Sequence, residues 1–258
     1  MRRSNRRYLF LLMLSMFSVS MPALAINISY DQCTTCGNPG DALQVFFTGI
    51  YPNNSAIIGF VNNTFSYDPE TQGAITNISI SVDKNATVSQ STNIPAGFSF
   101  ASGFRPLIEQ NGNYYIVSPT LAGPTTSPTN GTTTSVTTGY STISGSGLVA
   151  TDFEEYDFST GAFNPGFYPD FSGSTMLFGL AASYTALPTS VLSNATAESD
   201  YDNLSFVLDG PLATFSDSTF NLSNYSEIEY ITPEPTSILL LGTGLGAIGL
   251  AAWRRRKA

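Results

Sequence analysis

Apolar and polar side chains alternate over residues 76–83 of this 258-residue chain. Successive side chains of a β-strand point to opposite faces, so a period of two predicts a strand with one buried face. The expected inner face carries Thr76, Ile78, Ile80 and Val82, and the expected outer face carries Asn77, Ser79, Ser81 and Asp83. Leu204, Phe206 and Leu208 repeat the pattern, and no part of residues 26–232 shows a sustained helical period. We therefore expect an all-β fold.

Further short segments combine β-branched and aromatic residues and are separated by turn sequences. Additional strands are expected at residues 56–61, 97–104, 114–117, 147–153 and 176–182. Turns are expected at residues 52–54, 68–70, 111–113 and 209–211, where Pro, Asn, Asp and Gly gather. Many short strands with this punctuation predict an antiparallel β-sandwich of the jelly-roll or lectin-like kind.

Residues 118–139 interrupt this pattern because they consist mainly of Thr, Ser, Pro and Gly. The segment is either a linker between two domains or a long loop on one sandwich. A linker would leave two halves of roughly 90 residues each, whose hydrophobic cores would be marginal. We therefore expect one β-sandwich domain over residues 26–232, with a loop at 118–139.

The charge of the chain is unevenly distributed. The net charge is −9, but eight of the ten basic residues lie in the two tails. Residues 26–232 hold 18 acidic residues against only Lys84 and Arg105, a net charge of −16. Such a surface repels phosphate backbones, which excludes nucleic acid as a partner, and it favours divalent cations or neutral, hydroxyl-rich ligands. The chain has no histidine, which excludes histidine-based triads and histidine-ligated zinc or haem.

Residues 1–25 have the three parts of a secretory signal peptide. Four arginines within residues 2–7 form the positive region, and the apolar run over residues 8–19 is too short to span a bilayer comfortably. Ala23 and Ala25 provide the small side chains that signal peptidase recognises. We expect cleavage after Ala25 and export of the chain; a retained membrane anchor is the alternative.

Cys33 and Cys36 are the two cysteines of the chain. Haem attachment needs a histidine after the second cysteine, where Gly37 stands, and zinc would need two further cysteine or histidine ligands. A thioredoxin-like redox pair lies where a helix begins, whereas residues 37–40 form a turn sequence. In an exported chain we therefore expect a local disulfide between Cys33 and Cys36.

Residues 236–253 carry no charge. As a helix they extend about 27 Å, close to the roughly 30 Å thickness of the hydrocarbon layer. A buried core helix is the alternative, but Trp253 suits the membrane interface and a basic cluster follows it directly. The cluster consists of Arg254, Arg255, Arg256 and Lys257. We expect a transmembrane helix over 236–253 whose basic end stays in the cytoplasm and fixes the topology.

Pro233-Glu234-Pro235 stands just before this span, and together these parts resemble the PEP-CTERM sorting signal of Gram-negative bacteria. The resemblance covers residues 233–258. It implies that an exosortase, a membrane protease-transpeptidase, processes the tail at or near this tripeptide in a bacterium that makes exopolysaccharide or biofilm matrix. The protein would be held in the cell-envelope membrane before processing and would then reach the cell surface or the extracellular matrix.

Two acidic clusters are candidates for chemistry, and the first spans residues 152–157. In a strand, Asp152 and Glu154 would share one face, with Glu155 and Asp157 on the other. Paired carboxylates serve glycosidases as acid and base, and Glu154, Glu155 and Asp157 are the candidates. Carboxylates on a surface strand are more often only solvated.

The second cluster spans residues 198–203. Asp200, Asp202 and Asn203 bring several oxygen atoms together, as calcium requires, and form the candidate calcium site. The same residues lead into the expected strand at 204–208, where Asp and Asn commonly stabilise turns without an ion. No other cofactor is expected.

Several aromatic side chains would stack on sugar rings if exposed and would belong to the core if buried. They are Tyr114, Tyr115, Tyr156, Phe167 and Tyr168.

Two functions from different classes follow. The first is a non-enzymatic surface or matrix protein that exosortase sorts and that associates with exopolysaccharide. The alternative is a secreted polysaccharide-active hydrolase that uses the carboxylates near residues 152–157. A hydrolase places its carboxylates across a concave cleft, whereas a scattered, convex arrangement opposes hydrolysis.

Overall fold

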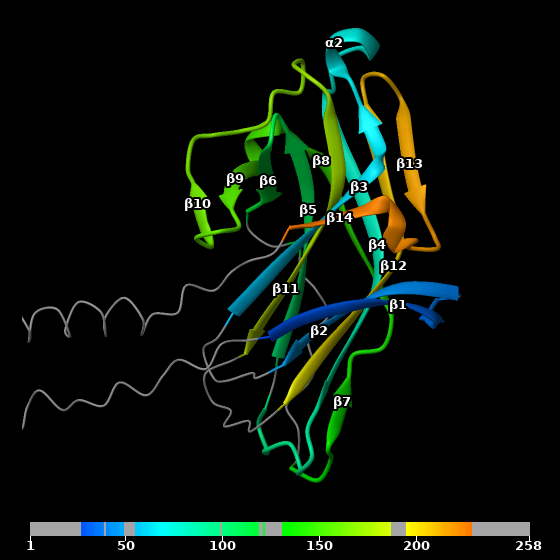
Figure 1. The fold of residues 1–258 in the computed structure, drawn as a ribbon, viewed down its shortest axis with the longest axis vertical. Helices are drawn as coiled ribbons and strands as arrows, with labels where there is room; N and C mark the ends of the chain where they lie inside the picture. The colour runs from blue at the N-terminus through cyan, green and yellow to red at the C-terminus, as the bar shows by residue number, and fades with distance from the viewer. Residues whose placement is uncertain are drawn as a thin grey trace, which may run out of the picture. The chain divides into compact units, whose positions relative to one another are not determined.

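The computed structural model describes residues 27–38, 40–48, 55–98, 100–118, 121, 131–186 and 195–228. Within these ranges the chain forms two seven-stranded antiparallel sheets that pack face to face (Figure 1). Both sheets belong to one compact unit, Ile26–Thr232. The prediction of an all-β, antiparallel sandwich is confirmed.

The first sheet has the order β1-β2-β12-β4-β7, with β13 beside β12 and β8 beside β4. Its strands are β1 (Asn27–Gly37), β2 (Gly40–Thr48), β4 (Asn77–Ser89), β7 (Ser135–Thr137), β8 (Ser141–Leu148), β12 (Thr196–Asp209) and β13 (Ala213–Asp217). The first half of β12 pairs with β2 and β4, and its second half pairs with β4 and β13. This long strand is therefore the centre of the first sheet.

The second sheet has the order β10-β9-β6-β5-β11-β3-β14. Its strands are β3 (Ser55–Tyr67), β5 (Phe100–Gln110), β6 (Asn113–Val117), β9 (Phe153–Asp157), β10 (Ala162–Asn164), β11 (Met176–Ala186) and β14 (Tyr225–Ile228). In the described part of the chain, three short helical turns connect strands: α2 (Pro69–Gln72), η1 (Ala150–Asp152) and η2 (Leu222–Asn224).

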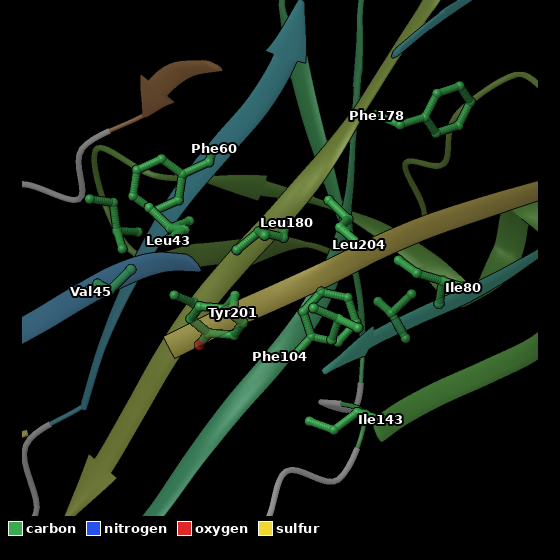
Figure 2. Close-up of a cluster of buried hydrophobic side chains, with 14 of the residues drawn as sticks. Leu43, Val45, Phe60, Ile80, Phe104, Ile143, Phe178, Leu180, Tyr201 and Leu204 are labelled. Carbon is green, nitrogen blue, oxygen red and sulfur yellow. The ribbon is translucent and has the colours of Figure 1, made fainter. Parts of the chain in front are cut away.

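One main hydrophobic core fills the space between the sheets (Figure 2). The first sheet contributes Leu43, Val45, Ile80, Ile143, Tyr201 and Leu204, and the second contributes Phe60, Phe104, Phe178 and Leu180. A second, smaller apolar cluster lies against the second sheet and includes Val61, Leu107 and Ile116. These three residues neighbour core-facing ones along their strands, so the smaller cluster covers the outer face of that sheet.

Strand β4 shows the predicted alternation, with Ile78, Ile80 and Val82 buried and the intervening side chains half-buried. The buried face continues to Val88. Thr76 is exposed and precedes the strand, so its prediction for the inner face was wrong. The strand begins one residue later because Thr76 still belongs to the connection from α2.

Three other predicted segments differ from the structure. Gly97 lies in a turn, so the strand predicted at 97–104 begins later, as β5 at Phe100. Residues 147–153 do not form one strand, because β8 ends at Leu148 and the short helix η1 precedes β9. The Asp152 carboxylate accepts a hydrogen bond from the Val149 N–H at 2.8 Å and closes this helical turn. The predicted loop at 118–139 contains β7, which pairs with β4 and packs the half-buried Val136 against the core.

Residues 1–26 and 229–258 lie outside the described residues. The predicted signal peptide, sorting motif and transmembrane helix over 236–253 fall on them. In the part of the chain that is described, no helix is both long and apolar enough to cross a membrane.

Candidate functional site

The residues predicted for export and sorting lie outside the described residues. They are Ala23 and Ala25 for signal peptidase, Pro233, Glu234 and Pro235 in the motif, and Trp253, Arg254, Arg255, Arg256 and Lys257 at the end of the predicted helix. Their roles stay predictions of the sequence.

The sulfur atoms of Cys33 and Cys36 are bonded, and the two Cα atoms are 5.5 Å apart. Both residues lie in β1, whose register against β2 shifts between Cys33 and Gly37. The bridge therefore closes a bulge at the end of the β1–β2 hairpin. The Tyr140 hydroxyl donates a hydrogen bond to the Cys36 carbonyl and connects this bulge to the segment before β8.

Residues 198–203 lie within β12, so the expectation that they form a turn before the strand was wrong. Glu198, Asp200 and Asp202 form a row of carboxylates on the outer face of β12, because alternate residues of a strand share a face. The Gln44 amide in β2 donates to Glu198 Oε1 at 2.7 Å and to Asp200 Oδ1 at 2.9 Å. Asn85 in β4 donates to Asp200 Oδ2 at 2.9 Å. Side chains from both neighbouring strands thus satisfy the buried Asp200 carboxylate.

Asn203 forms a bulge beside this row, with a φ of 52° and a register shift between Asp202 and Ser205. Its Nδ2 donates hydrogen bonds to Asp83 Oδ2 and to the Asn38 carbonyl, both at 3.0 Å. Asp202 accepts from the backbone N–H groups of Asn38 at 2.5 Å and Asn203 at 2.7 Å. Asn203 thus places an amide nitrogen, rather than a ligand oxygen, among these acceptor oxygens.

Across the described ranges, no group of three or more acidic, histidine or cysteine side chains is arranged to hold a metal ion. Calcium binding by Asp200, Asp202 and Asn203 stays a prediction. Sequence reasoning missed the contributions of Gln44, Asp83 and Asn85 to this cluster. For Asp83 the sequence did contain a signal, because this residue lies on the predicted outer face of the alternating segment at 76–83.

Glu198, the first carboxylate of this row, has a strongly raised pKa. Burial, together with the negative charge of Asp200, raises the pKa of Glu198 to about 7. Burial also raises the pKa of Asp202 above its ordinary value. Glu198 therefore takes up a proton more readily than a solvated glutamate does.

The carboxylates of residues 152–157 lie in different surroundings. Asp152 belongs to η1, so the prediction that it shares a strand face with Glu154 was wrong. Glu154 and Glu155 are consecutive in β9 and therefore point to opposite faces. Glu155 accepts a hydrogen bond from the Asn164 amide in β10 at 2.9 Å.

Asp157 stabilises the turn between β9 and β10. Its Oδ1 accepts from the Ser159 N–H at 2.8 Å and the Ser159 hydroxyl at 2.6 Å, and its Oδ2 accepts from the Thr160 hydroxyl at 2.8 Å. These hydrogen bonds hold the pKa of Asp157 below its ordinary value. A glycosidase acid needs a raised pKa, so this carboxylate suits a turn better than acid catalysis.

An open pocket of about 330 Å³ lies beside β9. It is lined by Gly112, Asn113, Tyr114, Glu155, Tyr156, Asp157, Phe158, Ser159 and Ile228. Phe158 packs over Gly59 in β3, where an added Cβ would lie only 2.8 Å from the Phe158 ring. The missing side chain at Gly59 therefore lets the β9–β10 turn close over the outer face of the second sheet.

The predicted sugar-stacking aromatics divide by burial. Tyr115 and Tyr156 are buried and Tyr114 is half-buried. Phe167 is 63% exposed and Tyr168 is 41% exposed. Of these five side chains, only Phe167 and Tyr168, which follow β10, are exposed enough to stack on a sugar ring.

A family model described as the PEP-CTERM protein-sorting motif matches residues 232–257. No curated protein matches the chain. Among solved structures, the chain is similar to the family 11 carbohydrate-binding module from Clostridium thermocellum, solved in complex with a β-1,3-1,4-mixed-linked tetrasaccharide. That likeness has 11% sequence identity and a TM-score of 0.28, and it covers 69% of this chain and 82% of that one. The resemblance carried by the tail is confirmed, and this chain is a protein with a C-terminal PEP-CTERM sorting motif.

Proposed function

We propose that the protein is an exported exosortase substrate that acts without catalysis at the cell surface or in the extracellular matrix, where it associates with exopolysaccharide. The observation that carries the proposal is the sorting motif at residues 232–257, which begins where the compact unit Ile26–Thr232 ends. A sorting signal at the boundary of a folded unit can be processed without disturbing that unit.

The proposed route uses both ends of the chain. Signal peptidase cleaves after Ala25, and the apolar span over 236–253 holds the exported protein in the membrane with Arg254 and its basic neighbours inside. Pro233 and Pro235 fix φ and lack amide donors, so they favour an extended strip outside the membrane. An extended backbone of this kind is what a protease groove binds.

Binding fits the observed geometry better than hydrolysis does. Glu154 and Glu155 point to opposite faces, and Asp157 is held by its own turn with a lowered pKa. The carboxylate whose pKa is raised to about 7 is Glu198, in the other sheet. These positions do not pair an acid with a base across the pocket beside β9.

The sorting proposal is tested with a Glu234→Ala, Pro235→Ala double variant in a host that carries the exosortase. We expect full-length, membrane-held protein to accumulate, which mass spectrometry of the C-terminus detects. Glu70→Ala is the matched control because it removes one exposed carboxylate from α2 in the sandwich. Normal processing of the double variant would overturn the assignment to exosortase.

A further inference from the structure

We infer that residues 165–171, the aromatic loop, bind a neutral, hydroxyl-rich polysaccharide chain by stacking sugar rings on Phe167 and Tyr168. This inference rests on the proposed association with exopolysaccharide and names its site and ligand class. The loop follows the edge strand β10 of the second sheet (Figure 1). Its two consecutive aromatic side chains are 63% and 41% exposed.

The aromatic loop is anchored on both sides of its exposed aromatic pair. The Glu155 N–H in β9 donates to the Phe167 carbonyl at 3.0 Å, so the loop backbone is attached to β9. On the other side of the pair, Pro169 and Phe171 are buried. Phe171 packs edge-on against Phe153 of β9, with ring centroids 6.0 Å apart.

The buried side chain of Gln110 in β5 secures the end of the loop. Its Oε1 accepts from the Asp170 N–H at 2.8 Å, and its Nε2 donates to the carbonyls of Asp170 at 3.0 Å and Ser174 at 2.9 Å. Pro165 and Pro169 flank the aromatic pair in the sequence and restrict the backbone further. A surface fixed before binding loses little entropy when a ligand arrives, which favours affinity.

The surroundings favour a neutral ligand. Two carboxylates lie close to the aromatic pair: Glu155 in the neighbouring strand β9, and Asp170 in the loop itself. Their negative charges repel an anionic polysaccharide. Arg105 of this sheet is half-buried, donates to the Val117 carbonyl at 2.5 Å and lies over the Phe163 ring, and its one positive charge is outnumbered by the carboxylates of Glu154, Glu155, Asp157 and Asp170. Carboxylate oxygens accept hydrogen bonds from sugar hydroxyls, while aromatic faces cover the apolar face of a sugar ring.

The pocket beside β9 shares Glu155 with the anchor of this loop. Glu155 lines the pocket, and its backbone N–H donates to the Phe167 carbonyl. Tyr114, Tyr156 and Phe158 line the pocket, and Tyr114 is the most exposed of the three. Aromatic walls with a few hydrogen-bonding groups are typical of small-molecule and sugar sites.

The test is affinity electrophoresis of the full chain, purified in mild detergent, through gels that contain defined polysaccharides. The neutral probes are hydroxyethylcellulose, dextran and galactomannan, and the charged probes are the carboxymethyl derivatives of the same three. We expect retardation by at least one neutral polymer and weaker retardation by its carboxymethyl derivative. The Phe167→Ala, Tyr168→Ala double variant should bind that polymer at least about tenfold more weakly.

Leu212→Ala is the control, because Leu212 is 81% exposed in the turn between β12 and β13 of the other sheet and its loss should leave retardation unchanged. A Phe167→Tyr variant keeps a ring at the same place and should retain binding. Undiminished retardation of the double variant would overturn the site while leaving polysaccharide association intact. If none of the six polymers retards the wild-type protein, polysaccharide association falls with the site, whereas the sorting proposal is judged by its own test.

Discussion

Replacing Lys84 by methionine should stabilise the protein at about pH 6 and destabilise it above about pH 10.5. Lys84 lies on the core face of β4 and is fully buried. Its ammonium group donates a hydrogen bond to the Ser102 carbonyl in β5 at 2.8 Å and lies 5.4 Å from the centre of the Tyr201 ring. Burial lowers the pKa of Lys84 from 10.5 to about 7, and the charge of Asp200 offsets only part of this effect.

The size of the effect follows from this pKa. In the unfolded chain Lys84 is protonated below pH 10.5, whereas in the folded chain it is protonated only below about pH 7. Its cost to stability is therefore full below about pH 7 and gone above about pH 10.5. At about 1.4 kcal/mol for each tenfold change in proton affinity, the full cost is roughly 5 kcal/mol.

Methionine removes this cost but leaves the Ser102 carbonyl without its donor, a loss of about 1–3 kcal/mol at every pH. Its unbranched side chain fits the space of the lysine stem. The expected net change is therefore a gain of about 2–4 kcal/mol near pH 6, close to zero near pH 9, and a loss of about 1–3 kcal/mol above pH 10.5.

Urea denaturation followed by far-UV circular dichroism at these three pH values measures the difference in unfolding free energy. Ile80→Met is the control, because it changes packing on the same face of β4 without changing charge. Its effect should not depend on pH. A Lys84→Met effect that is constant across the three pH values would refute the reasoning, as would destabilisation at pH 6.

Four further predictions concern other parts of the sandwich. Glu198→Gln should raise the melting temperature above pH 7 and change it little below pH 4.5, because the raised pKa of Glu198 makes its ionisation costly only in the folded state; thermal scans at pH 4 and pH 8 decide this. Gly179→Ala should destabilise by about 3 kcal/mol or more, since the new Cβ would lie 1.9 Å from a backbone carbonyl oxygen of β3, and a normal melting temperature would contradict the clash. The Cys33→Ser, Cys36→Ser double variant should lose at most about 2 kcal/mol, because the closed loop is short; alkylation of the non-reduced wild-type protein should detect no free thiol. If the predicted calcium site exists, excess CaCl₂ should raise the melting temperature of the wild-type protein but not that of Asp202→Asn. An unchanged melting temperature of the wild-type protein would contradict the calcium prediction.

Local alternation in the sequence predicted the strands that have one buried face. The segment at 76–83 was recognised because Ile78, Ile80 and Val82 repeat with the period of a strand. The buried face continues to Val88. Lys84 interrupts the apolar pattern, so the second half of β4 was not predicted. A buried charge is tolerated there because the opposite sheet supplies a carbonyl oxygen, which no local pattern reveals.

The candidate sites depended on pairing between distant segments. Gln44 and Asn85 reach Asp200 because β2 and β4 flank β12, and the sequence does not state which strands are neighbours. The exposed positions of Phe167 and Tyr168 likewise follow from the anchoring of their loop. Composition identified them as aromatics that would bind sugars if exposed, and only the fold established their exposure.

Strand β14 would carry a mechanical load if the protein is held through its tail, as we propose. It is the last described strand before the sorting motif, so a pull on an anchored tail reaches the sandwich through residues 225–228. Its backbone pairs with β3, yet Glu227 also accepts a hydrogen bond from the Tyr30 hydroxyl of β1 at 2.5 Å. On the other side, Ile228 packs in the apolar cluster that contains Phe158. Tension on the tail is thereby shared between both sheets and the β9–β10 turn, and does not fall on one short edge strand alone.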